Sequence, residues 1–158
     1  MFAFFPLLLL VVIAYNIVAL MGGAGMFAAN MIDPETAEGS FSTFKLMNTA
    51  IAEIPMPSGN NWILVYGDLF VVAGLFLLFI EIVRSTSSGG EAITNHTLSI
   101  GVLVLCIIEF AVVPGFATST FFFLTIMALV DVVAGFTISI KAARRDFGVT
   151  DGSPFAGG

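Results

Sequence analysis

Long runs of apolar residues dominate the sequence, and most of them end at glycine or at basic residues. The four runs cover about residues 2–22, 62–84, 97–114 and 120–141. A helix that crosses the hydrocarbon core of a bilayer needs about 20 apolar residues, so each run is long enough, or nearly so. The runs are continuous, whereas the strands of a membrane barrel alternate. The pattern therefore predicts an all-α integral membrane protein, a four-helix transmembrane bundle.

The segments between the runs differ in length and character. Residues 24–61 form the longest segment, and within it residues 41–53 place apolar side chains at helical spacing before Pro55 ends the pattern. We expect this stretch to form an amphipathic helix on the membrane surface, and the alternative is an ordinary loop. The last two runs are joined by a short link, which makes them an antiparallel pair. Thr118 or Ser119 can cap the helix that follows.

Composition agrees with a membrane protein of one domain. Of the 158 residues, 58% are hydrophobic and 10% are charged, whereas soluble domains carry about 25% charged residues. The net charge of −6 and the lack of a basic patch exclude a nucleic-acid binder. The single cysteine, Cys106, excludes an internal disulfide and is expected to be a buried apolar side chain. The partner that the composition indicates is the lipid bilayer.

Basic residues give the expected orientation. Arg84 follows the second run and Lys141 begins the basic end of the fourth, whereas Lys45 lies in the long first loop. Because basic residues concentrate on the cytoplasmic side, we expect both termini and the 142–158 tail in the cytoplasm of a bacterial inner membrane. The 24–61 loop then lies outside. A cleaved signal peptide is the alternative for the first run, although it lacks a positively charged start.

Polar side chains inside the apolar runs are the main candidates for function, because an ionisable group at the bilayer centre costs at least about 2.5–3.5 kcal/mol. They are Asn16, Asp68, Glu109 and Asp131. Their depths along antiparallel helices would let all four meet in one layer. No Lys or Arg is expected at that depth, so the acids are protonated, hold a cation or meet a partner chain. Helix association, partner docking and a proton or cation path stay open as roles.

Small residues mark where helices are expected to approach closely, because they let two backbones come together. The residues assigned to helix packing are Gly67, Gly74, Ala128 and Gly135. At the cytoplasmic end of the second run, Glu81 lies three residues before Arg84. We expect Glu81 to form an ion pair with Arg84 or with Lys141 of the fourth run.

Residues suited to catalysis or metal binding are scarce. His96 is the only histidine, and we expect it at the membrane interface, although it is also the one candidate for holding a haem or pigment. The sequence has no HxxxH, no CxxCH and no histidine cluster, so neither a metal site nor a cofactor is predicted. A lipid, haem or pigment bound within a complex stays open.

These features predict a small polytopic membrane protein without enzymatic activity. The expected role is an accessory, assembly or scaffold subunit of a larger membrane complex or of a homo-oligomer. The alternative is a proton or monovalent-cation channel or transporter that uses the intramembrane carboxylates.

Overall fold

The computed structural model describes residues 5–23, 40–85, 92–113 and 115–148. Parts of the predicted 24–61 loop and of the 142–158 tail lie outside these ranges. The elements, in chain order, are α1 (Leu8–Gly23), α2 (Ser40–Met47), β1 (Ala50–Pro55), β2 (Asn61–Val65), α3 (Tyr66–Ser85), α4 (Ala92–Val112) and α5 (Ser119–Gly148). The protein is therefore mostly helical, with one small sheet.

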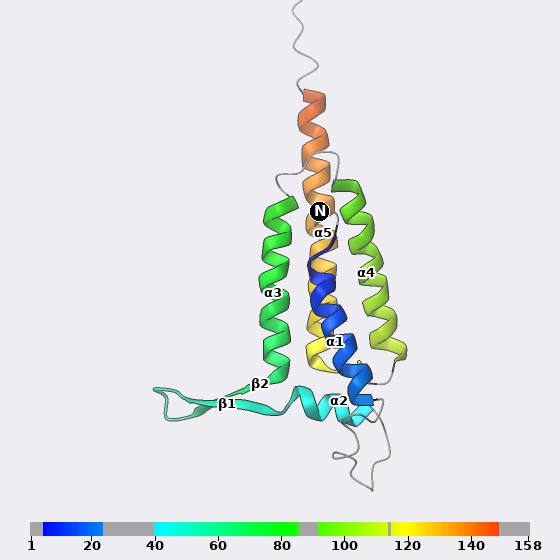
Figure 1. The fold of residues 1–158 in the computed structure, drawn as a ribbon. Coiled ribbons are helices and arrows are strands. Elements are labelled where there is room, and N and C mark those ends of the chain that lie inside the picture. The colour runs from blue at the N-terminus through cyan, green and yellow to red at the C-terminus, as the bar shows by residue number, and fades with distance from the viewer. Residues whose placement is uncertain (1–4, 24–39, 86–91, 114, 149–158) are drawn as a thin grey trace, which may run out of the picture.

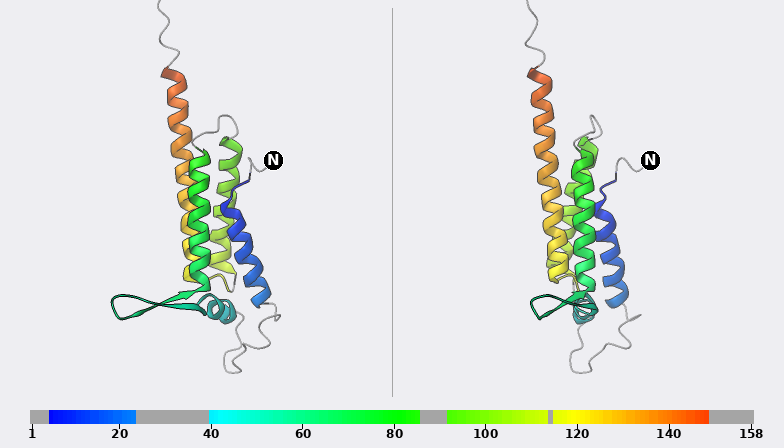
Figure 2. Two further views of the ribbon diagram at one scale, coloured as in Figure 1. Left: turned by 60° about the vertical axis from the view of Figure 1, so that its left-hand side comes forward. Right: turned by 90° about the vertical axis from the view of Figure 1, so that its left-hand side faces the viewer.

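The four long helices lie side by side, and the other elements lie across one end of them. Figures 1 and 2 show α1, α3, α4 and α5 running roughly along one axis, with α2 and the strands across their lower end. We call this the hairpin end, after β1 and β2, and the opposite end, where α3 stops at Ser85, the far end. Thr120 of α5 lies against Gly67, and Met127 lies against Gly74, so α3 and α5 run parallel.

Two helical segments are long and apolar enough to cross a membrane. They are Tyr66–Ser85 and Ser119–Lys141. The apolar parts of α1 and α4 are shorter, covering Leu8–Met21 and His96–Val112. Large apolar side chains are exposed on all four helices, as on Leu20, Phe79 and Val112. Such surfaces are unusual on a soluble monomer, which agrees with association with a membrane.

The second apolar run begins as a strand, so the prediction of a helix from residue 62 was wrong at its start. Asn61–Val65 forms β2 and pairs antiparallel with β1, and the helix begins at Tyr66. The predicted helix over 41–53 is likewise shorter, because α2 ends at Met47 and Ala50–Pro55 forms β1. Strand and helix share the same apolar run, so hydrophobicity alone could not separate them.

Local sequence explains the hairpin. β-branched and aromatic residues occur on both sides of the turn, for example Ile54, which pairs with Trp62, and such residues favour strands. The Met56 amide donates to the Asn60 carbonyl at 2.9 Å. Gly59 has a φ of 86°, which glycine adopts without steric cost and which lets the chain reverse.

The core at the hairpin end is built around Tyr15 of α1, whose side chain is fully buried. Its ring centroid lies 5.6 Å from those of Phe70 and Phe116 and 4.8 Å from that of Phe121. Its hydroxyl forms a hydrogen bond with Thr118 Oγ1 at 2.5 Å. That same oxygen accepts from the Phe121 amide at 3.2 Å, which confirms Thr118 as the N-cap of α5.

The turn between α4 and α5 depends on Gly115. Its φ of 93° places it in the left-handed region, where a side chain is disfavoured. A Cβ at this position would also lie 3.1 Å from Thr43 Oγ1 of α2. Glycine therefore lets the chain reverse and also lets α2 pack over the turn.

Candidate functional site

Asn16 and Glu109 are the two residues of the predicted polar layer that the structure joins. Asn16 Nδ2 donates to Glu109 Oε2 at 3.1 Å and to the Val12 carbonyl at 3.1 Å. Both side chains are half-buried. The contact links α1 to α4, and it gives the Glu109 carboxyl a polar partner inside the protein.

Asp68 has a local role at the start of α3. It lies in the first turn, and its Oδ2 accepts from the Val65 amide at 3.0 Å. Val65 is the last residue before the helix, so this is the return bond of a capping box. The sequence prediction began this helix at residue 62, and that error placed Asp68 too deep in the span.

Asp131 lies in a different part of the structure from Glu109. Glu109 is three residues before the end of α4 and Asp131 is twelve residues after the start of α5. Because these antiparallel helices are joined by a short turn, a 1.5 Å rise per residue separates the two acids by about 13 Å along the axis. Glu109 and Asp131 therefore do not share the single polar layer that their depths in the sequence predicted.

The Asp131 carboxyl lies among polar groups of two other helices. The side chain is only 7% exposed. It faces Ser99 of α4, and it interacts electrostatically with His96 of α4 and Arg84 of α3. The Ser99 hydroxyl lies near this carboxyl but forms no hydrogen bond with a described residue. Arg84 therefore contributes a positive charge to the surroundings of this buried acid. The expectation that no Lys or Arg lies at the depth of Asp131 stays a prediction.

His96 of α4 is buried against Gly135 of α5. Its expected position at the membrane interface stays a prediction. Its side chain is 9% exposed. Its ring packs on Gly135 so closely that a Cβ there would overlap ring atoms Nδ1 and Cε1. The sequence signal that would have shown this is the three-residue spacing of His96 and Ser99, which places both on the α4 face that also carries buried Cys106.

Buried polar atoms without a protein partner gather along the same pair of helices. Four such side-chain atoms occur within the described ranges. They are His96 Nε2, Ser99 Oγ, Ser139 Oγ and Thr43 Oγ1. Three of the four belong to α4 or α5, where Ser139 follows Asp131 by eight residues and so shares its helix face. We call His96, Ser99 and Asp131 the α4–α5 polar cluster.

The small residues assigned to packing all lie at tight positions. A Cβ on Gly67 would overlap Thr120 Oγ1, and one on Gly74 would lie 2.8 Å from Met127 Sδ. Both glycines therefore let α3 approach α5. Ala128 is 2% exposed in the core, and Gly135 gives room to the histidine ring of α4.

Glu81 and Arg84 hold the start of the first helix at the far end. Glu81 is 1% exposed, and its Oε2 accepts from the Leu8 amide at 3.2 Å. Arg84 Nη2 donates to the Phe5 carbonyl at 3.0 Å. A carboxylate at a helix N-terminus satisfies an amide that has no intrahelical partner and interacts favourably with the helix dipole. Pairing of Glu81 with Arg84 or with the exposed Lys141 stays a prediction.

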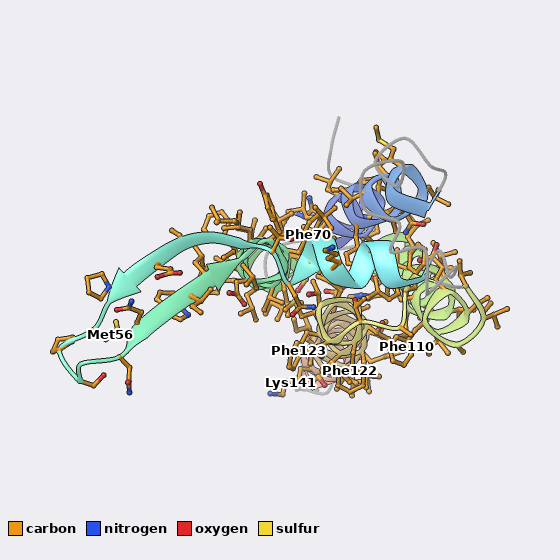
Figure 3. The ribbon with its side chains drawn as sticks, turned by 90° about the horizontal axis from the view of Figure 1, so that it is seen from below. Met56, Phe70, Phe110, Phe122, Phe123 and Lys141 are labelled. Carbon is orange, nitrogen blue, oxygen red and sulfur yellow. The ribbon has the colours of Figure 1, made fainter. Side chains whose placement is uncertain are left out.

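The hairpin stands apart from the helices. All residues from Ala50 to Ile63 are exposed. Figure 1 shows the hairpin projecting sideways, and Figure 3, seen along the helix axis, shows its strands side by side with Met56 near the tip. The sheet therefore lies roughly across the axis of the helices, at the level where they end.

The two faces of the hairpin differ. Ile54 pairs with Trp62 and Ala52 pairs with Leu64, and because side chains alternate along a strand these four share one apolar face. The other face is mixed, because it carries Glu53, whose Oε2 accepts from Asn61 Nδ2 at 3.5 Å, and also Ile63, which pairs with Glu53. An apolar cavity of about 330 Å³ opens nearby between α1, α2 and α3. Its lining is formed by Val18, Met21, Leu46, Met47, Tyr66 and Phe70.

The arrangement defines a mostly helical protein with two helices able to cross a membrane, a projecting hairpin and a buried polar cluster. Among the described residues, no three His, Cys, Asp or Glu side chains are grouped so that they could hold a metal ion. No protein-family model, curated protein or solved structure matches the chain.

Proposed function

We propose that this protein is a non-enzymatic accessory or assembly subunit of a larger membrane complex. In this proposal α1, α3, α4 and α5 all cross a bacterial inner membrane. Both termini lie in the cytoplasm, and the hairpin lies on the outer surface. The observation that carries the proposal is the hairpin, which projects beyond the helices and is exposed from Ala50 to Ile63.

An isolated two-stranded hairpin is at best marginally stable in water, which indicates that this one works against another surface. Six residues of β1 extend about 20 Å at the usual rise per strand residue. A sheet lying flat on a membrane presents one face to lipid, the other to water and its edges to neighbouring proteins. The apolar face with Ile54 and Trp62 suits the bilayer interface, where tryptophan is enriched.

The open edges of the sheet suit a strand or extended segment of another transmembrane subunit. Unpaired edge amides and carbonyls are a ready template for strand addition. Neighbouring proteins in the same membrane lie at the level of these edges. The proposed occupant is therefore a different membrane protein, bound along β1 or β2.

The test compares the natural protein with a variant in which residues 51–63 are replaced by a short Gly-Ser linker. Both are purified gently from the native membrane and examined by native mass spectrometry, and the identified partner is then recombined with each purified protein. We expect the natural protein to bind a second membrane protein and the variant to bind it at least tenfold more weakly. Val72→Ala, an exposed position on α3, is the control and should bind normally.

A complex that forms equally well without the hairpin would refute this proposal. A natural protein that is purely monomeric, or that associates only with itself, would refute the choice of partner.

A second candidate function, proton or monovalent-cation transfer, is favoured by Asp131 alone. Asp68 bonds within its own helix start, and Glu109 is paired with Asn16. The candidate therefore predicts flux in liposomes that is lost on Asp131→Asn and kept on Asp68→Asn. Equal flux in the natural protein and in Asp131→Asn would exclude it.

A further inference from the structure

The α4–α5 polar cluster combines two unpartnered polar atoms with a buried carboxyl. His96 Nε2 and Ser99 Oγ are both buried and have no protein partner in the described part of the chain. Both belong to residues that are at most 9% exposed. They lie beside the buried Asp131 carboxyl, with which both residues interact. The cluster thus combines an imidazole nitrogen and a hydroxyl of α4 with a carboxyl of α5, all of them in buried residues.

Buried polar groups in proteins are almost always satisfied, either by protein atoms or by an ordered water. An internal water needs two to four polar partners, and this cluster supplies three. We propose that His96, Ser99 and Asp131 form a buried site that binds one water molecule and, through it, shares one exchangeable proton between the imidazole and the carboxyl.

The proton balance of the site is simple. In one form the proton is on the Asp131 carboxyl, and His96 is neutral. In the other form the water has accepted that proton and donated another to His96 Nε2, which leaves an imidazolium and a carboxylate. The net charge of the site is the same in both forms. The Ser99 hydroxyl holds the water in place in either form, because a hydroxyl can donate or accept.

A proton fits this site better than a metal cation does. Arg84 already places a positive charge near the Asp131 carboxyl, and a bound metal cation would add a second one. An imidazole nitrogen is also a poor ligand for the hard alkali and alkaline-earth cations, which prefer oxygen. Water adds no charge.

Among the residues whose side chains the structure describes, the charged groups nearest the site can be named. On α3, Arg84 acts on Asp131, and Glu81 is bonded to the start of α1. On α5 the next charged residue toward the far end is Lys141, and on α4 it is Glu109, thirteen residues from His96. The sequence of α1 contains no charged residue. A change in the titration of His96 can therefore be assigned to Asp131 by substitution.

The experiment uses the fact that His96 is the only histidine. The full chain is labelled with ¹⁵N-histidine, reconstituted in lipid bilayers and followed by solid-state NMR across a pH series, so that every imidazole signal comes from this residue. We expect a cross-peak between the ring and a bound water. We also expect the pH at which the ring changes form to move by at least about one unit in Asp131→Asn, because the two groups no longer share a proton.

Two further variants make the result specific. Ser99→Ala should weaken the water cross-peak, because it removes one of the three partners of the water. Cys106→Ala changes a buried residue on the same face of α4 and should leave the histidine signals unchanged.

Three results would overturn the inference. They are the absence of a water cross-peak, a histidine that never changes form, and the same pH profile in the natural protein and in Asp131→Asn. The inference concerns proton binding alone. Its failure would not refute hairpin-dependent assembly or proton flux. Those two proposals are tested by different measurements, native mass spectrometry and flux in liposomes.

Discussion

Gly135 should be important for the stability of the protein because the His96 ring packs on it. A Cβ added at Gly135 would overlap two atoms of that ring. The ring is a rigid plane buried between α4 and α5, so it cannot yield by a small rotation. We therefore expect Gly135→Ala to destabilise the protein, although alanine is the better helix former.

Gly101→Ala supplies the matched control. Gly101 lies within α4, and a Cβ there would meet nothing within 4 Å. Both substitutions gain the same helix propensity, at most about 1 kcal/mol. Only the one at Gly135 overpacks the interior, which costs about 1–3 kcal/mol. The difference in unfolding free energy between the two variants should therefore be about 1–3 kcal/mol.

A double-mutant cycle tests whether the ring is the cause. The loss of helical circular dichroism is followed during SDS titration in mixed micelles, for Gly135→Ala and Gly101→Ala, each in the natural and in the His96→Ala background. Without the ring, the difference between the two glycine substitutions should fall to within about 0.5 kcal/mol, the usual limit of additivity. An equal effect of Gly135→Ala in both backgrounds would refute the reasoning.

Other contacts give further expectations. Tyr15→Phe loses the hydrogen bond to Thr118 but keeps the ring packing, so it should cost about 0.5–1.5 kcal/mol in the same SDS titration; no loss would contradict the contact. Glu81→Gln removes the charge at the start of α1, worth about 0.3–2 kcal/mol, and should speed hydrogen exchange at the Leu8 amide; unchanged exchange would count against it. Trp62 is the only tryptophan, and its fluorescence should be quenched by brominated lipids and only slightly by aqueous iodide, with the reverse pattern excluding a lipid-facing hairpin.

The helices were predictable from the sequence because each one lies within a long apolar run. Their packing was partly predictable too. Gly67 and Gly74 stand out as small residues on α3, and the structure places both against α5. Thr118 and Ser119 were recognisable as candidate caps because they stand just before an apolar run. These predictions rest on local composition, which the sequence displays directly.

The hairpin was not predictable by the same means. The apolar run that becomes α3 starts at Trp62, and nothing in its hydrophobicity marks the change from strand to helix at Tyr66. That change depends on the pairing of β2 with β1, which is a contact between segments. The role of Asp68 was lost with it, since a capping residue can be recognised only when the start of the helix is known.

The α4–α5 polar cluster could not be predicted from the sequence, for a different reason. Sequence depth placed Asp131 near the middle of its span, but helix rotation decides its neighbours, and about 100° of rotation per residue makes facing sensitive to small errors. His96 was assigned to the interface because it stands beside polar residues in the sequence. In the structure it turns inward, where glycine leaves room for its ring.

Some polar residues within the helices have a protein partner, whereas His96 Nε2 has none within the described ranges. This difference is the reason for assigning a role to the α4–α5 polar cluster. If polar residues within the four helices served only to hold the helices together, each should be matched with a partner. That is true of Tyr15 with Thr118 and of Asn16 with Glu109, which join α1 to its neighbours. His96 is buried, its Nε2 has no protein partner within the described ranges, and the residue interacts electrostatically with the Asp131 carboxyl. Helix association alone does not explain that arrangement, because an apolar side chain would pack there at lower cost. The proposed water-mediated proton site accounts for both the burial and the missing protein partner.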